Sequence, residues 1–382
     1  MDYIGAVNQP LPWYTSAGIG VADLNEPQNK RRRASKKNER ALAATVHDVA
    51  RLANVSTATV SRALNSPDLV SPEVRERVSN AVKKLGYIPN DSARALRQSQ
   101  TRLIGVIVPT LNYALYAAFF SAVREALGKS GYFPVLTTSE YDLGAEADEI
   151  RKLAKHGAQG LILVGLLRDP DAAGFLAASG IPHICTYATN LYDSETAIGF
   201  DNTRAIEDVV EYLVSLGHRR LAMLSGVTSN RNDRALARRA GFVNAVRAHR
   251  LECADWVAEQ PYTIEGGRSA LCDILDRGLQ PSAIVCGSDM LAIGALQECK
   301  ARGINVPQDL SIMGFDDLEI AAHLDPALST VAVPSRDLGR LAAESIVTLC
   351  SGGEPQRHAA LGTRLVIRST TAAPPAPKAR HA

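Results

Sequence analysis

The sequence predicts a small all-α domain followed by a large α/β core with parallel sheets. Two observations indicate this division. Residues 45–65 form two short helical segments joined by a tight turn, and from residue 101 onward apolar runs alternate with amphipathic stretches. With 382 residues, 46% hydrophobic and 21% charged, the chain has material for more than one hydrophobic core.

The segment 45–65 has the pattern of a helix-turn-helix. Thr45 and Ser56 stand where a side-chain oxygen can cap the first unpaired N–H groups of each helix. Asn54 tolerates the left-handed backbone that a tight turn requires. Four apolar residues recur at helical spacing and are expected to pack the two helices together: Val49, Leu52, Val60 and Leu64.

The face of the second helix opposite that core is small and polar with one long cation. It carries Thr57, Ala58, Ser61 and Arg62. Such a surface fits the floor of a DNA major groove, where an arginine makes a bidentate contact to a guanine edge. An ordinary helical hairpin is the alternative, because short signals of this kind also occur without DNA binding.

A third helix begins at Ser71-Pro72-Glu73 and ends at Gly86, so three helices can close a small core. Residues 90–97, beyond Pro89, form a capped helical segment of roughly two turns, which is marginal alone in water. We therefore expect a helix-turn-helix domain at 45–89 and a short hinge helix with its linker at 90–100.

A set of short motifs recurs in order along the chain: Asp48-Val49-Ala50, Val55-Ser56, Thr59-Val60-Ser61-Arg62, Asn65, Tyr87-Ile88-Pro89-Asn90, Ala93, Leu96 and Ile104-Gly105-Val106. In these residues, and from about Thr45 to Thr370, the chain resembles the lactose-repressor/galactose-repressor family of bacterial transcription regulators. The resemblance implies that the hinge orders on operator DNA, where Leu96 enters the minor groove and kinks the duplex. Packing against the hinge of a second copy is the other role open to Leu96.

The DNA-binding residues that follow from the motif and the resemblance are Thr45, His47, Ser56, Thr57, Ala58, Thr59, Ser61, Arg62, Asn65, Asn90, Ala93 and Leu96. Arg62 matches the family's common arginine. Thr57 and Ala58 occupy the recognition positions that vary most between members, so the operator sequence cannot be transferred from a relative.

Charge is unevenly distributed along the chain. The net charge is +2, but residues 30–100 hold fifteen Lys and Arg against six Asp and Glu, which places the basic end toward nucleic acid. We expect residues 1–44 to be a disordered basic arm that adds phosphate contacts. A translation start placed too early, a merely solvated tail and a nuclear signal are the alternatives, although the bacterial-type architecture disfavours the last.

Compartment and redox state follow from what the sequence lacks. No apolar run reaches membrane-spanning length and the first thirty residues have no signal-peptide pattern, so we expect a cytoplasmic bacterial protein with no membrane partner. The six cysteines show no CxxC pair or metal-ligand spacing, so reduced thiols, no metal and no cofactor are expected: Cys185, Cys253, Cys272, Cys286, Cys299 and Cys350.

The core is expected to span 101–370. Its expected strands are 103–108, 132–136, 160–164, 184–187, 197–200, 221–224, 283–286 and 310–315, with helices such as 116–129, 204–216 and 234–249 between them. Length and the resemblance together imply two interleaved, doubly wound subdomains of the kind found in periplasmic binding proteins, at about 101–201 and 202–329, both completed by 330–370. Residues 371–382 are expected to be a disordered Pro/Ala-rich tail.

The resemblance also implies an effector site between these subdomains. The matching positions are Tyr113, Leu115, Tyr116, Tyr187, Arg238, Tyr262, Ser288, Asp289 and Asp316. An arginine and a carboxylate among aromatic walls suit a sugar or sugar acid, because each buried polar contact must be paired. Core packing, surface salt bridges and helix capping are the alternative roles for these residues.

Together these features predict a DNA-binding regulator, expected to repress, whose affinity for a palindromic operator is controlled by a small effector. Half-site symmetry requires a homodimer, and the proline-rich end has no heptad repeat that would build a tetramer. An enzyme is disfavoured because GxGxxG, GxxxxGK[ST], GxSxG and HExxH are absent from the sequence. A solute-binding or sugar-processing protein with the same core fold is the alternative function.

Overall fold

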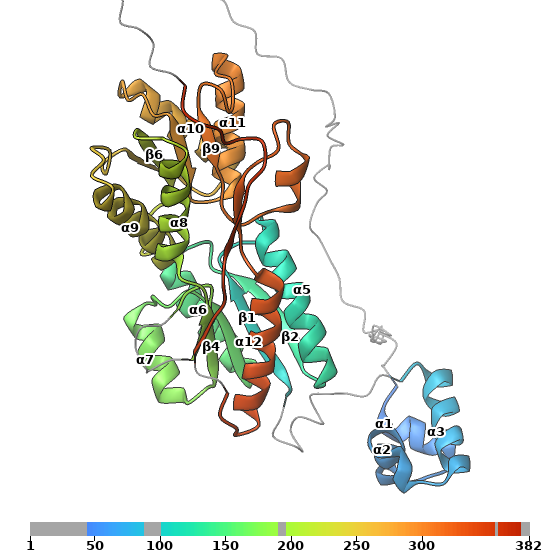
Figure 1. The fold of residues 1–382 in the computed structure, drawn as a ribbon. Helices are drawn as coiled ribbons and strands as arrows, with labels where there is room; N and C mark the ends of the chain where they lie inside the picture. Colours follow the sequence, from blue (N-terminus) through green and yellow to red (C-terminus); the bar gives the residue numbers. More distant parts are fainter. Residues whose placement is uncertain (1–43, 88–100, 190–195, 356–357, 376–382) are drawn as a thin grey trace, which may run out of the picture. The chain divides into compact units, whose positions relative to one another are not determined.

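The computed structural model describes residues 44–87, 101–189, 196–355 and 358–375. The chain divides into two compact units, Met1–Pro89 and Asn90–Ala382. Figure 1 shows the first unit as a cluster of helices and the second as two lobes of helices around sheets.

The first unit consists of α1 (Val46–Ala53), α2 (Thr57–Asn65), the short 3-10 helix η1 (Pro67–Leu69) and α3 (Pro72–Leu85). Thr45 and Asp48 form a capping box at the start of α1, and Ser56 caps α2. Asn54 has the left-handed φ of 52° that the turn requires, and Gly86 ends α3 at φ 59°. Ser71 precedes Pro72 at the start of α3 but makes no side-chain cap.

The helix packing differs from the expectation at two leucines. Val49 and Val60 are buried as predicted, but Leu52 is 44% exposed and Leu64 is 37% exposed. Alanines occupy the contact instead, because small side chains let the helices approach closely. The buried residues of this core are Val49, Ala50, Ala53, Val60, Ala63, Val78 and Ala81.

The first lobe of the second unit is a parallel sheet with the strand order β11-β5-β4-β3-β1-β2. Its strands are β1 (Leu103–Val108), β2 (Phe133–Thr138), β3 (Gly160–Val164), β4 (His183–Thr186), β5 (Ala197–Gly199) and β11 (His358–Ala360). α5 (Ala114–Lys129) and α12 (Ser335–Cys350) pack side by side on one face. α6 (Leu143–Lys155) and α7 (Pro170–Ser179) cover the other face.

The second lobe is a four-stranded parallel sheet with the order β7-β6-β8-β9. Its strands are β6 (Leu221–Ser225), β7 (Val257–Glu259), β8 (Ala283–Cys286) and β9 (Ser311–Met313). α8 (Asn202–Ser215) pairs with α9 (Asp233–Ala248) on one side, and α10 (Ile264–Asp276) pairs with α11 (Asp289–Arg302) on the other. The central strands β6 and β8 are buried along their whole length because both faces of the sheet are covered.

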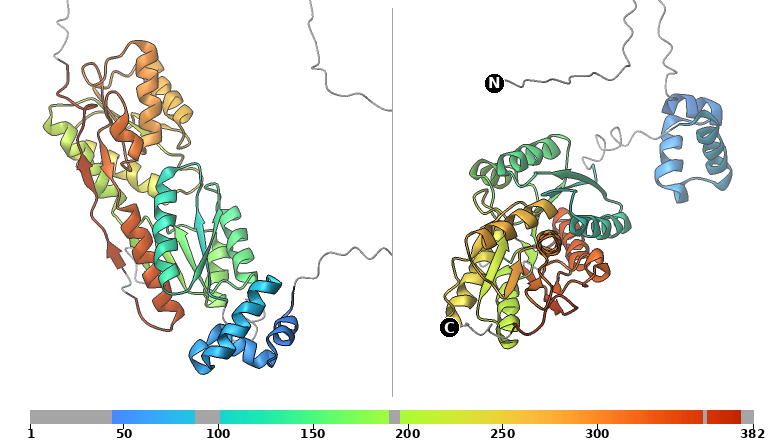
Figure 2. Two further views of the ribbon diagram at one scale, coloured as in Figure 1. Left: turned by 90° about the vertical axis from the view of Figure 1, so that its right-hand side faces the viewer. Right: turned by 90° about the horizontal axis from the view of Figure 1, so that it is seen from above.

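The chain passes between the lobes after β5 and again near its end. β10 (Thr330–Ala332) and β12 (Arg364–Val366) pair antiparallel, while α12 and β11 lie between them in sequence and join the first lobe. The 3-10 helix η2 (Glu319–His323) follows β9. Figures 1 and 2 show this returning segment running along both lobes.

Residues 371 and 372, which were expected to belong to a disordered tail, are hydrogen-bonded to the second lobe. His218 Nε2 and the Ala372 carbonyl oxygen form a hydrogen bond of 2.8 Å, and the Thr371 hydroxyl bonds the hydroxyl of Tyr212 at 3.1 Å. Buried hydrogen-bonding groups of the second lobe need partners, and this part of the tail supplies them.

The predicted fold class, a helical unit plus an α/β core of two parallel sheets, is confirmed. All eight predicted strand runs contain a strand, with bounds shifted by up to two residues. The pattern missed four of the three-residue strands, β7, β10, β11 and β12, and found β5 and β9 because apolar neighbours lengthen those two runs.

Candidate functional site

The predicted DNA-reading surface lies on the first two turns of α2. Ala58 and Arg62 are exposed, and Thr57 and Ser61 are partly exposed. The side chain of Asn65 donates to the Ser61 carbonyl oxygen at 2.8 Å, so it ties the helix rather than pointing away from it. The exposed guanidinium of Arg62 is thus the longest polar group on this face of α2.

Three of the predicted DNA contacts also hold the ends of helices. Ser56 Oγ accepts the Thr59 N–H at 3.1 Å and bonds the Thr59 hydroxyl at 2.9 Å. The Thr45 hydroxyl donates to Asp48 Oδ2 at 2.7 Å, and this bond lowers the pKa of Asp48 below its usual value. His47 is exposed. Asn90, Ala93 and Leu96, and with them the expected hinge helix, lie outside the described residues, as does the basic arm up to residue 43.

In the second unit, Tyr113 and Asp316 meet at the boundary between the lobes. Tyr113 precedes α5 and its hydroxyl donates to Asp316 Oδ2, which lies on the loop after β9. Asp316 is 3% exposed and has a φ of 115°, a conformation that favours glycine. Its Oδ1 has no hydrogen-bond partner among the described residues, and burial raises the pKa of this carboxyl well above its usual value.

Arg238, on α9, lies beside this pair, and two of its three guanidinium nitrogens are hydrogen-bonded. Its Nε donates to Asn202 Oδ1 at 2.9 Å and its Nη1 donates to the Gly287 carbonyl oxygen at 2.6 Å. Its Nη2 lies 3.9 Å from Asp316 Oδ1, and its Cζ lies 3.8 Å from the centre of the Phe315 ring. The side chain is 6% exposed, and burial lowers the pKa of the guanidinium.

Three further predicted effector residues form the wall behind Tyr113. The Tyr116 ring lies edge-on to Tyr113, with centroids 6.0 Å apart, and edge-on to Tyr187, with centroids 5.5 Å apart. Tyr187 also contacts Phe119 and Phe200, and it is 1% exposed. Leu115 is buried in the same cluster. Tyr187 therefore packs as a core residue, whereas Tyr113 lines a cavity.

The predicted role of Ser288 and Asp289 as effector contacts does not agree with their geometry. Ser288 Oγ caps α11 by accepting the Leu291 N–H at 3.2 Å. Asp289 accepts the Leu318 N–H at 2.7 Å and the Thr330 hydroxyl at 2.6 Å, so both of its carboxylate oxygens are engaged. These residues hold the loop after β9 in place because a buried polar group must be paired. Both are fully buried, and neither lines the cavity beside Tyr113.

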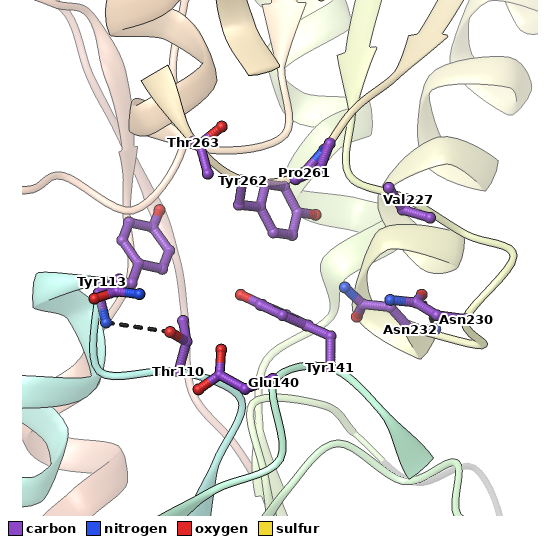
Figure 3. A pocket seen from close by; sticks show the side chains of 11 residues that line it. Thr110, Tyr113, Glu140, Tyr141, Val227, Asn230, Asn232, Pro261, Tyr262 and Thr263 are labelled. Atoms are coloured by element: carbon purple, nitrogen blue, oxygen red, sulfur yellow. Dashed lines mark hydrogen bonds between the residues drawn. The ribbon is translucent and has the colours of Figure 1, made fainter. Parts of the chain in front are cut away.

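Tyr262 opens onto a cavity of about 300 Å³ between the lobes, which Figure 3 shows from close by. Its lining also includes residues that the sequence analysis did not single out: Thr110, Asn112, Glu140, Tyr141, Val227, Asn230, Asn232, Pro261 and Thr263. Most of them stand just after a strand, so the rule that ligands bind at the carboxyl ends of parallel strands could have found them.

A compartment of about 30 Å³ beside this cavity is lined by charged groups from both lobes. Asp233, at the start of α9, accepts the Leu166 N–H at 2.5 Å, which joins α9 to the loop after β3. Arg234 Nη1 lies 2.6 Å from Asp233 Oδ1, and Arg168 Nη1 lies 3.6 Å from Glu146 Oε1. Burial raises the pKa of Glu146 despite these neighbouring arginines.

Neither a metal centre nor a membrane span is found in the described part of the chain. Across the described ranges, no group of three or more His, Cys, Asp or Glu side chains is placed to hold a metal ion. The helices of these ranges are also too short or too polar to cross a bilayer.

A capped helix-turn-helix together with a two-lobed core that encloses a polar, aromatic cavity defines a ligand-responsive transcription regulator. Comparison with known proteins agrees. Residues 45–90 match bacterial regulatory proteins of the lacI family, and residues 210–371 match a periplasmic binding protein-like domain. The chain belongs to the lacI family of bacterial regulatory proteins and is a DNA-binding transcriptional regulator.

Similar proteins extend over most of the chain. The transcriptional repressor CytR of Escherichia coli K12 is 32% identical over 340 residues, which cover 87% of this chain and 98% of CytR. The ribose operon repressor of Haemophilus influenzae is 32% identical over 313 residues, 80% of this chain and 91% of that repressor. A Lac repressor dimer bound to operator and an anti-inducer is similar at a TM-score of 0.78, with 29% identity over 86% of this chain and 99% of that one.

Proposed function

We propose that this regulator represses transcription as a homodimer on a palindromic operator, and that a sugar or sugar acid bound between the lobes controls its affinity for DNA. The observation that carries the effector part is the cavity of about 300 Å³ at the strand ends of both lobes, walled by Tyr113 and Tyr262. Cavities of this size and lining bind small molecules, and aromatic faces stack on sugar rings.

Relatives support a carbohydrate. A ribose operon repressor is 32% identical to this chain, and a CelR–cellobiose complex is similar at a TM-score of 0.64 with 29% identity. These proteins share the two-lobed core, so the same cleft is the proposed site in this chain. A regulatory rather than an enzymatic role is part of the proposal, because the similar proteins are transcriptional regulators.

The homodimer follows from how a helix-turn-helix reads DNA. One recognition helix covers one half-site, and a two-fold dimer places a second helix about one helical turn away. The similar Lac repressor structure is a dimer bound to operator. Because the similar repressors are bacterial DNA-binding proteins, we propose that this chain acts in the cytoplasm of a bacterium.

Control of DNA affinity is proposed to pass through residues 90–97. A helix of two turns forms only when DNA and the second copy supply contacts, so a ligand that changes the separation of the two copies changes its stability. A coupling of about 1–3 kcal/mol would change operator occupancy by roughly 5–150-fold and act equally on effector affinity.

The test is binding of the purified full-length protein to palindromic DNA from its own promoter. Fluorescence anisotropy at moderate salt should show a preference over random DNA, and a panel of sugars should shift that affinity. The same sugars are assayed for turnover in parallel. Equal affinity for palindromic and random DNA under every condition, or conversion of a sugar without any effect on DNA binding, would contradict the proposal.

A further inference from the structure

The cavity has three tyrosines around it and a single charged side chain. Tyr113, Tyr141 and Tyr262 come from three different segments and their rings surround the cavity, as Figure 3 shows. Glu140 is the charged residue of the lining, and the remaining polar groups are the hydroxyls of threonines and the amides of asparagines. Glu140 is exposed, and the described residues that line the cavity include no lysine or arginine.

Tyr141 is held in the cavity by an unusual backbone. Glu140 and Tyr141 follow β2 with φ of 48° and 61°, two successive side-chain-bearing residues in the left-handed region. Such conformations cost free energy and persist where the surrounding structure enforces them, often at ligand sites. The result is that the Tyr141 ring lies 6.1 Å from the Tyr262 ring at an interplanar angle of 55°.

Tyr262 needs space that only a glycine leaves. A Cβ at position 226 would lie 2.3 Å from Cζ of Tyr262, so Gly226 allows the ring to seat against the strand end. The Tyr262 hydroxyl is buried and has no hydrogen-bond partner among the described residues. A buried hydroxyl without a partner is costly unless a ligand or water completes it.

The buried arginines close to this cavity are engaged elsewhere. Arg238 donates to Asn202 and to the Gly287 carbonyl oxygen, and it does not line the cavity. Arg234 pairs with Asp233 at 2.6 Å in the smaller neighbouring compartment. Arg231 also lines that compartment but not the cavity, and its side chain is exposed. An anionic ligand would therefore lose water beside a carboxylate without gaining a cation, which is unfavourable.

From this geometry we propose that the cavity selects an uncharged, hydroxylated ring and rejects sugar acids and sugar phosphates. The ring stacks on Tyr141, its hydroxyls donate to Glu140, and the Tyr262 hydroxyl gains the partner it lacks. This inference rests on the proposed function, because it concerns the effector of that same site. The sequence suggested that Arg238 would bind the carboxylate of a sugar acid. The cavity lining instead favours a neutral ligand.

The first experiment compares neutral probes with their anionic counterparts by isothermal titration calorimetry on the full-length protein. The pairs are glucose with glucuronate, ribose with ribose 5-phosphate, and uridine with uridine 5′-monophosphate. In any pair that binds, the neutral member should bind at least about 10-fold tighter. Tighter binding of an anionic member overturns the inference. Binding of none of the neutral probes by protein that binds its operator also overturns it and leaves the DNA-binding regulator intact.

The second experiment reverses the cavity charge. Glu140→Lys should reduce the ratio between neutral and anionic affinities by about 10-fold or more, because the lysine supplies the missing cation. Glu252→Lys makes the same charge change at an exposed position outside the cavity lining and should leave the ratio unchanged. Equal ratios in Glu140→Lys and in the unaltered protein would contradict the role of Glu140.

A third comparison tests the stacking contact. Tyr141→Ala should weaken binding of the neutral ligand by about 10-fold, whereas Tyr141→Phe keeps the ring and should retain most of the affinity. Thermal unfolding of both variants shows whether they fold. If folded Tyr141→Ala binds as tightly as the unaltered protein, the ring makes no contact with the ligand.

Discussion

The hydroxyl of Tyr113 donates a hydrogen bond to the carboxylate of Asp316, and this bond joins the start of α5 to the loop after β9. Both residues were predicted to contact the effector, and in the structure they contact each other. Asp316 also lies 3.9 Å from the Nη2 atom of Arg238, so one buried carboxylate connects residues of both lobes. A ligand hydroxyl that reaches Asp316 must compete with Tyr113.

Replacing Tyr113 by phenylalanine tests the hydrogen bond between Tyr113 and Asp316. Tyr113→Phe leaves the ring but takes away a donor from Asp316, whose other carboxylate oxygen already has no partner among the described residues. The free energy of unfolding should fall by about 1–3 kcal/mol, as for other buried groups that lose a partner. Chemical denaturation measures it, with Tyr132→Phe as the control. Equal loss in both variants would mean that the bond has no specific effect.

The stability of the core should depend on the titration of Asp289. Burial raises the pKa of its carboxyl to about 7, against the hydrogen bonds from Thr330 and Leu318, which lower it. A carboxyl with a raised pKa stabilises the fold fully below the unfolded value, and this contribution is lost as the pH rises through the folded value. Compared with Asp289→Asn, the free energy of unfolding should fall by about 1.4 kcal/mol per unit between about pH 4 and pH 7.

Denaturation series of the unaltered protein and Asp289→Asn across this range isolate the effect, because all other titrating groups are shared. A constant difference between the two proteins from pH 4 to pH 7 would show that Asp289 does not change protonation there.

A side chain at Gly165, in the loop after β3, should displace the side-chain ends of Arg234 and Asp233. The φ of Gly165 is 88°, and a Cβ there would lie 2.0 Å from Nη1 of Arg234 and 2.8 Å from Oδ1 of Asp233. Gly165→Ala should therefore disturb the contact between α9 and this loop and lower the free energy of unfolding by more than the roughly 1–3 kcal/mol of backbone strain. Gly180→Ala is the matched control, since its φ is 65° and no atom lies within 4 Å. If the free energy of unfolding falls by a similar amount in both variants, backbone strain alone explains the effect of Gly165→Ala.

Reading of the operator should depend on Arg62. Arg62→Ala removes an exposed guanidinium from α2, so specific binding should weaken by about 1–3 kcal/mol, with relaxed preference at one base pair per half-site. Binding to a set of single-base operator variants measures this. Arg77→Ala, on α3, is the control for loss of a positive charge. If Arg62→Ala lowers the affinity for specific and random DNA equally, Arg62 contacts only the phosphates.

Leu96 should act in DNA binding and not in ligand binding. Leu96→Ser replaces the expected apolar wedge by a polar group, which weakens insertion between bases, so operator affinity should fall. Affinity for a bound sugar, measured without DNA, should stay the same. Unchanged operator affinity would reject the wedge, and a changed sugar affinity would place Leu96 in contact with the core.

Local features of this chain were predictable from the sequence because their causes are local. Thr45 and Ser56 cap helices within three residues of themselves, and Asn54 supplies the left-handed turn. The β1 bounds 103–108 follow from an apolar run that is buried on both faces. The same local logic could not separate Leu52 from Val49, since both fit a helical period and only packing with small alanines decides between them.

The sequence by itself determined that this chain has a helix-turn-helix and a doubly wound core, because capping, turn chemistry and the alternation of apolar runs act over a few residues. Tertiary structure alone decided which polar groups are available to a ligand. Asp289 meets Thr330 across 41 residues, Arg238 meets Gly287 across 49, and Tyr113 meets Asp316 across 203. Each pairing depends on how the lobes and loops pack, and no short-range pattern records it.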